Sequence, residues 1–294
     1  MTKPVNYVLE ADIKGFFDSV EHAKLMTLLE KRIADRALLR LIGRILKSGI
    51  MEEGKYWETE TGTPQGGIVS PILANIYLHY ALDEWFEREQ KKRLRGYASL
   101  IRYADDFVIC VKYAEEAKEI ERALEERFEG YGLRLSKEKT RLVEFGRYAE
   151  ERTARRGERP GTFDFLGFTH YCDKTRRGGF KVGHKTSKKK FRRGVKAMNE
   201  WLKKGRNVMP LKDLWERLAW KLNGHYQYYG ISGNSQGIRR YRDIVVRQAY
   251  KWLNRRSQRK SWNWESFSRY MERYPLPKPR ICHNLYTLSP TRGG

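Results

Sequence analysis

The chain has 294 residues, and 40% of them are hydrophobic, which is enough to bury a sizeable core in two lobes. No apolar run approaches the roughly 18 residues of a membrane helix, and the N-terminus lacks a signal-peptide core. We therefore expect no membrane partner and no secretion. Three widely spaced cysteines without a C-x-x-C pair argue against a disulfide framework or a structural zinc site, and they predict reduced thiols at Cys110, Cys172 and Cys282.

The formal charge of +24 is unevenly distributed. Residues 1–150 carry 25 Lys and Arg against 26 Asp and Glu, a net of −1, whereas residues 151–294 carry 35 against 10, a net of +25. Such a basic field concentrates polyanions, and interleaved aromatic rings can stack on bases. The composition therefore predicts a nucleic-acid partner and a cytoplasmic, nucleoid-associated protein.

The first predicted strand, near 5–12, ends on a carboxylate. An apolar run leads to Asp12, and the chain then turns into a helix at a glycine, followed by helices predicted over 21–33 and 36–48. A loop further along combines a proline of fixed φ with two glycines, so that its backbone can approach a base pair or a phosphate closely. A serine and a proline then predict the start of a helix over 71–94.

Two adjacent carboxylates fall at a predicted hairpin turn, in Tyr103-Ala104-Asp105-Asp106, between strands near 100–104 and 107–112. Carboxylates held together by strands stay ionised only beside a strong counter-charge, which is usually a divalent metal ion. With Asp12 as a third carboxylate, the set can hold two ions about 3.5–4 Å apart, as in polymerases and nucleases. For any single aspartate the alternative is a cap or turn role.

The remaining elements divide the chain into an α+β half and a helical half. A helix is predicted over 114–130, followed by strands near 133–135 and 140–146 and a hairpin around 163–183. Residues 152–161 show no periodic pattern of apolar residues, which indicates a mobile basic loop. Helices follow over 186–204, 211–229, 235–257 and 263–272. The four-residue spacing of Leu214, Leu218, Leu222 and Tyr226 predicts one buried helix face. Of the six tryptophans beyond residue 200 together with Tyr226, Tyr228 and Tyr229, we expect fewer than half to contact RNA.

These motifs, in this order, resemble reverse transcriptases, and within that family the group II intron-encoded type. The resemblance extends from about residue 7 to residue 271. Its motifs are Asp12-Ile13-Lys14-Gly15-Phe16-Phe17-Asp18, Thr63-Pro64-Gln65-Gly66-Gly67-Ile68-Val69-Ser70-Pro71, the Tyr103 turn, Gly132-Leu133-Arg134-Leu135-Ser136-Lys137-Glu138-Lys139-Thr140, and Phe163-Asp164-Phe165-Leu166-Gly167-Phe168. The resemblance implies a polymerase palm, with an antiparallel sheet plus helices, followed by an α-helical thumb or maturase domain.

The resemblance also implies roles for the site residues. Asp12, Asp105 and the Ile13 carbonyl would ligate two Mg²⁺ ions, with Mn²⁺ as a substitute, and Asp106 would support the cluster. Phe17, beside Phe16 at the nucleotide, would exclude ribonucleotides, and the alternative for its ring is a place in the core. Gln65 and Gly66 would contact the incoming nucleotide and the templating pair. Lys139 would protonate the pyrophosphate leaving group, or else is an ordinary exposed lysine.

The implied nucleic-acid contacts of the thumb are basic. The run Lys185-Thr186-Ser187-Lys188-Lys189-Lys190-Phe191-Arg192-Arg193 could be a nuclear localisation signal, but it fits better as the start of a helix along a template–primer backbone. The predicted contact residues are Lys188, Lys189, Lys190, Arg192, Arg193, Lys221, Arg239 and Arg240. The predicted domains are a palm over 1–172, a linker and hairpin over 173–185, a thumb over 186–275 and a tail over 276–294.

The resemblance implies an RNA-directed DNA polymerase that adds dNTPs to a DNA primer on an RNA template and also binds or helps to splice intron RNA. One alternative is a catalytically weak or inactive RNA-binding maturase, and another is a reverse transcriptase of the CRISPR-linked, diversity-generating, retron or defence lineages. The three intact aspartates favour the enzyme, because a structural palm has no need for three mutually repelling carboxylates.

The two ends of the chain carry a further expectation. Asp12 lies only eleven residues from Met1, whereas the family places a fingers region before the first palm motif. We expect the fingers to be absent from this chain and to be supplied by a separate polypeptide. Beyond His283 only eleven residues remain, without Cys pairs, so we expect no C-terminal endonuclease domain.

Overall fold

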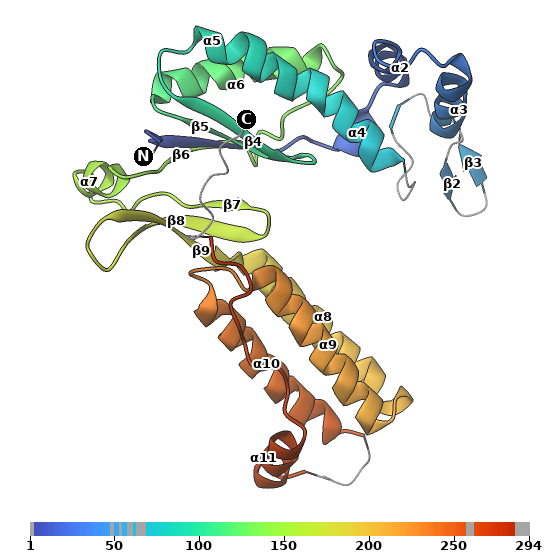
Figure 1. Cartoon of the computed structure of the whole chain (residues 1–294), viewed down its shortest axis with the longest axis vertical. Coiled ribbons are helices and arrows are strands. Elements are labelled where there is room, and N and C mark those ends of the chain that lie inside the picture. Colours follow the sequence, from blue (N-terminus) through green and yellow to red (C-terminus); the bar gives the residue numbers. More distant parts are fainter. Residues whose placement is uncertain are drawn as a thin grey trace. The chain divides into compact units, whose positions relative to one another are not determined.

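The computed structural model describes residues 3–47, 50–52, 55–57, 61–62, 69–256 and 262–285. The chain forms two compact units, one of residues 1–166 with 171–182 and the other of residues 167–170 with 183–294 (Figure 1). The domain limits at 172, 185 and 275 stay predictions. No helix in the described ranges is long and apolar enough to cross a membrane. The three cysteines are free thiols, as predicted.

The first unit is built on a four-stranded antiparallel sheet. Its strands are β1 (Tyr7–Ala11), β4 (Ala98–Tyr103), β5 (Asp106–Val111) and β6 (Arg141–Glu144), in the order β4-β5-β1-β6. The strand β1 is central and pairs with β5 from Tyr7↔Val111 to Ala11↔Phe107, and with β6 from Tyr7↔Glu144 to Glu10↔Arg141. A separate pair, β2 (Ile50–Glu52) and β3 (Lys55–Trp57), forms a short hairpin.

Helix α6 (Ala114–Glu129) packs on one face of this sheet, against β1 and β5, and the π-helical η1 (His79–Glu84) packs on α6. The other helices of the unit are α1 (Phe16–Ser19), α2 (His22–Glu30), which packs on α3 (Arg36–Lys47) and α4 (Ser70–Leu78), and the π-helical η2 (Phe86–Gln90) with α5 (Lys91–Arg93). Side chains alternate between the two faces of a strand, so Leu9, Phe107 and Ile109 pack with α4 and α6. Val8 and Val108 point to the other face, where a smaller cluster contains Phe163.

Three local predictions were wrong in detail. Residues 133–135 form no strand, because only Leu135 pairs, in a single bridge with Ile13. The basic segment 152–161 begins inside a short helix, α7 (Ala149–Ala154), whose Thr153 is buried. The helix predicted to start at residue 71 begins one residue earlier, at Ser70.

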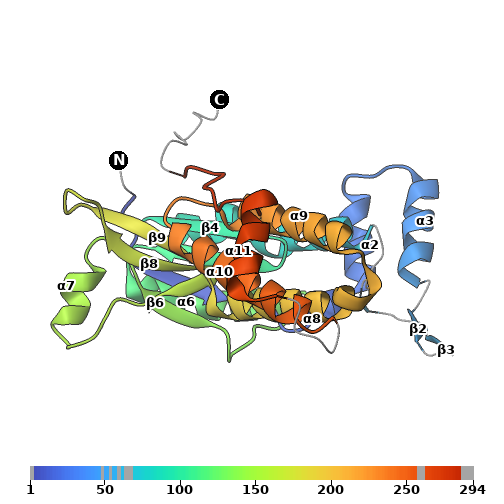
Figure 2. The ribbon, with the colours of Figure 1, turned by 90° about the horizontal axis from the view of Figure 1, so that it is seen from below.

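A three-stranded sheet of β7 (Phe163–Phe165), β8 (Phe168–Lys174) and β9 (Phe180–Thr186) is divided between the two units, with β7 in the first. The helices of the second unit, which form a bundle, are α8 (Lys188–Val208), α9 (Leu211–Tyr229), α10 (Ser235–Leu253) and α11 (Trp264–Arg273). Helices α8, α9 and α10 run side by side (Figure 2). Leu214, Leu218, Leu222 and Tyr226 are at most 1% exposed, which confirms the predicted buried face.

A half-buried histidine, His225, lies in this bundle. The His225 ring stacks on Tyr241 with ring centroids 3.6 Å apart and planes 8° from parallel. Its Nε2 is buried without a hydrogen-bond partner among the described residues. Burial lowers the pKa of His225 to about 4. The neutral ring is therefore the form that packs in the folded bundle.

Acid should destabilise the bundle through His225. Between pH 6.5 and about 4 the unfolded chain binds a proton that the folded chain excludes, so the free energy of unfolding falls as the pH drops through this window, by at most about 1.4 kcal/mol per pH unit. His225→Phe keeps a stacked ring and should flatten this dependence in urea unfolding followed by circular dichroism. The exposed His79→Gln should keep the wild-type slope, and an equally steep slope in His225→Phe would assign the effect to another group.

Candidate active site

The register of β1 against β5 places two of the three predicted carboxylates side by side. The ladder ends on the pair Ala11↔Phe107, and one step further the same register sets Asp12 opposite Asp106. Residues opposite each other in antiparallel strands point to the same face. Both side chains therefore belong to the face of Val8 and Val108, away from the helix-covered face.

Backbone hydrogen bonds join Asp12 and Lys14, just after β1, to residues 134–136, which precede Lys139. The Ser136 amide donates to the Asp12 carbonyl at 2.8 Å, and the Lys14 amide donates to the Arg134 carbonyl at 2.9 Å. The amides of Lys139 and Thr140 both donate to the Ser136 carbonyl, at 3.0 and 2.8 Å. This tight turn directs Lys139 back toward Asp12.

Lys139 and Asp12 form an ion pair. The ammonium donates to the Asp12 Oδ2 atom, and the two side chains are 65% and 24% exposed respectively. The hydrogen bond to Asp12 and the charge of that carboxylate raise the pKa of Lys139, and the charges of Asp106 and Glu138 add to the effect. Lys139 is thus a cation bound to Asp12, although 127 positions separate the two residues in the sequence.

Asp105 and Asp106 lie at the turn between β4 and β5. Tyr103 pairs with Asp106, so Ala104 and Asp105 form a two-residue turn in which Ala104 has a φ of 54°. Asp105 is half-buried and Asp106 is exposed. The predicted hairpin is confirmed. Across the described part of the chain, however, no group of three or more His, Cys, Asp or Glu side chains has a spacing that could hold a metal ion.

Phe16 and Phe17 differ in burial. Phe16 is 4% exposed within the helix-side core, whereas Phe17 is half-buried and packs against that core, with the two ring centroids 5.3 Å apart. Gly62 lies beside this segment, because a Cβ built on it would be 3.2 Å from the Phe17 carbonyl. Gln65 and Gly66 lie outside the described residues.

The sequence analysis did not identify a cluster of polar side chains that contacts the Asp105–Asp106 turn. Arg102, directly before the Tyr103 motif, donates to Asp83 and Asn75 and to the Ala104 carbonyl. It also missed Glu10, which accepts from Arg141 Nε at 2.7 Å. The only sequence signal for Arg102 was an arginine in an otherwise apolar strand.

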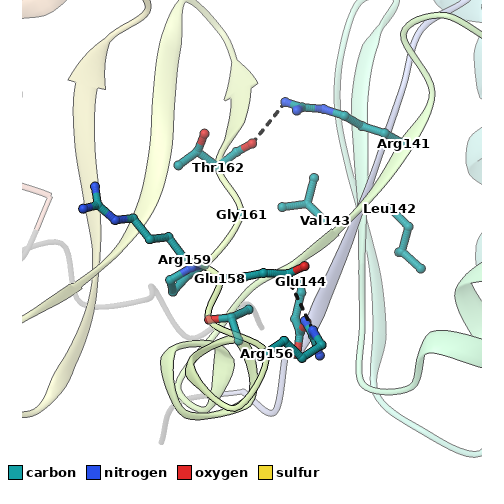
Figure 3. A pocket seen from close by; sticks show the side chains of 11 residues that line it. Arg141, Leu142, Val143, Glu144, Arg156, Glu158, Arg159, Gly161 and Thr162 are labelled. Carbon is teal, nitrogen blue, oxygen red and sulfur yellow. Dashed lines mark hydrogen bonds and ion pairs between the residues drawn. The ribbon is translucent and has the colours of Figure 1, made fainter.

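A separate pocket of about 430 Å³ lies along the edge strand β6 (Figure 3). Arg141 donates to the Thr162 carbonyl at its rim, and the guanidinium groups of Arg152 and Arg156 bind Glu144. Partial burial opposes ionisation of Glu144, but the hydrogen bonds from Arg156 and Arg152 lower its pKa overall. Two arginines of the predicted basic loop are therefore paired with a carboxylate, and none of Asp12, Asp105 and Asp106 lines this pocket.

The predicted nucleic-acid contacts all lie in the second unit. The side chains are exposed at each of Lys188, Lys189, Lys190, Arg192, Arg193, Lys221, Arg239 and Arg240. The Lys221 ammonium lies 5.0 Å from the centre of the Trp201 ring, and the Arg240 guanidinium lies 5.5 Å from that of Phe191. Of the tryptophans, Trp215 and Trp252 are buried, whereas Trp220 is 63% exposed.

Known proteins resemble this chain in sequence. The group II intron-encoded protein LtrA of Lactococcus lactis subsp. cremoris is 34% identical over 156 residues, which cover 49% of this chain and 26% of LtrA. A 91 kDa protein in the cob intron of Schizosaccharomyces pombe is 49% identical over 85 residues, 29% of this chain and 10% of that protein. The apo telomerase of Candida tropicalis gives a TM-score of 0.48 at 15% identity, covering 92% of this chain and 45% of that chain.

The chain thus spans about a quarter or less of the length of these two curated relatives. Residues 1–170, more than half of the chain, match the family model described as reverse transcriptase (RNA-dependent DNA polymerase). This match covers Asp12 after β1, the β4–β5 turn and the segment that contains Lys139. The chain therefore belongs to the reverse transcriptase family.

Proposed function

We propose that the chain is an RNA-directed DNA polymerase of the group II intron type, which adds dNTPs to a DNA primer on an RNA template and also binds intron RNA during splicing. The observations that carry the proposal are the register of β1 against β5, which one step beyond Ala11↔Phe107 sets Asp12 opposite Asp106, the adjoining turn with Asp105, and the ion pair of Lys139 with Asp12. The similarity to LtrA supports the intron lineage over the other lineages of reverse transcriptase.

The donor atoms of this site suit Mg²⁺ by their type, whereas the carboxylates among the described residues are not spaced to hold an ion. All its candidate ligands are oxygen atoms, which this ion prefers, and the Asp12 carboxylate already binds a cation, the Lys139 ammonium. The residues that would hold two ions are Asp12, Asp105 and the Ile13 carbonyl, with Asp106 beside them. When bound, such ions neutralise the developing charge on the attacking and leaving oxygens of an in-line displacement.

The protein side chains have separate tasks in this proposal. Lys139 is protonated at neutral pH, and its exposed stem lets the ammonium turn from Asp12 toward a leaving pyrophosphate and donate a proton. Phe17 is half-buried against the core and presents the rest of its ring where a sugar would lie. A 2′-hydroxyl there would meet an apolar surface and lose its hydrogen-bond partners, which selects deoxynucleotides.

The helical unit is proposed to bind the nucleic-acid backbone. The basic side chains at the start of α8 are solvent-exposed, and Trp220 offers an exposed ring for stacking. Phosphate contacts of this kind release counterions, so their strength depends on salt rather than on base sequence. An RNA template or intron RNA fits this chemistry.

A second candidate function is that of an RNA-binding maturase with little or no polymerase activity. The pairing of Asp12 with Lys139 favours it, because a lysine that permanently neutralised this carboxylate would keep a metal ion away. Primer extension on poly(rA)/oligo(dT) with Mg²⁺ distinguishes the two functions, since only the polymerase extends the primer.

Asp105→Ala should reduce dTTP incorporation by at least about three orders of magnitude, because stabilisation of the transferred phosphoryl group contributes most of the rate. The measurement is single-turnover primer extension. Asp213→Ala, an exposed aspartate in the first turn of α9, is the control and should retain the wild-type rate. Normal synthesis by Asp105→Ala would contradict the proposed mechanism.

Phe17→Ala should preserve DNA synthesis and admit ribonucleotides, because the apolar wall under the sugar is removed. The readout is the ratio of kcat/KM for dTTP to that for UTP, which should fall. Phe128→Leu, a change inside the helix-side core, is the control and should leave the ratio unchanged. Unchanged sugar discrimination in Phe17→Ala would assign Phe17 to the core alone.

A further inference from the structure

Arg102 links the carboxylate turn to the long helix. Its Nε donates to Asp83 Oδ1 at 2.7 Å and its Nη2 donates to Asp83 Oδ2 at 2.5 Å, so the pair is bidentate. Its Nη1 donates both to Asn75 Oδ1 at 2.9 Å and to the Ala104 carbonyl at 2.8 Å. One guanidinium thus joins a residue of α4, a residue of η1 and the backbone of the turn.

This link lies on the face of the sheet opposite to the carboxylates. Arg102 pairs with Phe107, whose side chain lies in the helix-side core, so the Arg102 side chain points to the same side. The Arg102 side chain is 13% exposed and that of Asp83 is 27% exposed. A bidentate pair this well shielded is stronger and more directional than a surface ion pair.

The turn needs such a restraint. Ala104 has a φ of 54°, in the left-handed region, which is strained for a residue with a Cβ. A two-residue turn of this kind can relax by rotating the peptide between Ala104 and Asp105. The Arg102 hydrogen bond to the Ala104 carbonyl opposes this rotation, and the same peptide sets the direction of the Asp105 side chain.

We propose that Arg102, anchored by Asp83 and Asn75, is a positioning residue that holds the Asp105–Asp106 turn in its working orientation. The proposal deepens the proposed function and rests on it for its kinetic consequences. Arg102 touches neither the substrate nor the reacting atoms. It acts through the backbone of the turn, and it couples the carboxylates to α4.

Lysine cannot replace Arg102 in this role. The guanidinium presents a planar fork that serves two carboxylate oxygens, an amide oxygen and a carbonyl at once, whereas an ammonium is a point charge with three donors on a flexible stem. Arg102→Lys therefore keeps the charge beside Asp83 while releasing the turn. Comparing Arg102→Lys with the wild type therefore separates the positioning role of the guanidinium from the effect of its charge.

The test is single-turnover and steady-state primer extension on poly(rA)/oligo(dT) by the full 294-residue chain. Arg102→Lys should lower kcat by about 10- to 100-fold while the KM for dTTP stays within about threefold, because a displaced catalytic group slows chemistry more than it weakens binding. Asn75→Ala, which removes one anchor, should lower kcat in the same direction by a smaller factor.

Arg152→Lys is the matched control. Arg152 also serves several acceptors, namely Glu144 and the carbonyls of Asn6 and Phe145, but at the opposite end of β1 from Asp12. The melting temperature of Arg152→Lys should fall by about as much as that of Arg102→Lys, while its kcat should stay at the wild-type value. A wild-type kcat in a folded Arg102→Lys protein, or an equal loss of kcat in Arg152→Lys, would overturn the proposal.

Hydrogen exchange of peptides spanning 98–111 gives a readout that does not need activity. Arg102→Lys should speed exchange around the turn, and Arg152→Lys should not. If the wild-type chain extends no primer, the proposed function fails, and the exchange result alone then decides whether Arg102 restrains the turn. Unchanged exchange at the turn in Arg102→Lys would refute the restraint.

Discussion

The register of β1 between β5 and β6 is the constraint on which the candidate site depends. Leu9 and Ala11 face the helix-side core while Val8 faces the smaller cluster, so the strand has two buried faces that accept only one alignment. A slip of one residue would exchange these faces and direct Asp12 into the helix-side core. Burying an ionised carboxylate there without a partner would cost several kcal/mol. The apolar residues of β1 thus determine where its terminal carboxylate lies.

The second requirement is that the negative charge of the carboxylates is balanced, and the ammonium of Lys139 supplies a positive charge beside Asp12. Asp12 and Asp106 repel each other across the end of the ladder, and Lys139 reduces this repulsion through an exposed and movable side chain. The Asp105–Asp106 turn is restrained from the opposite face by Arg102. In this structure a lysine ammonium therefore balances part of the negative charge at the end of the ladder.

The hairpin at Ala104–Asp105 and the buried stripe from Leu214 to Tyr226 were predictable, because each depends on residues close together in the sequence. The segment 133–135 was overpredicted as a strand, since its apolar residues pack without pairing beyond Leu135. The ion pair of Lys139 with Asp12 and the bonds of Arg102 to Asp83 and Asn75 join residues far apart in the chain. No local pattern encodes such contacts. They follow from the register of the sheet and the packing of α4 and η1.

The most direct test of this account is the affinity of the site for Mn²⁺, measured by electron paramagnetic resonance in the absence of nucleotide and nucleic acid. If the Lys139 ammonium occupies the position of a metal ion at Asp12, Lys139→Met should bind Mn²⁺ more tightly than the wild type. Removing one unit charge about 4 Å away is worth about 1 kcal/mol or more, or roughly fivefold in affinity. Asp12→Asn should bind Mn²⁺ more weakly than the wild type. Equal Mn²⁺ affinity in all three proteins would contradict the account.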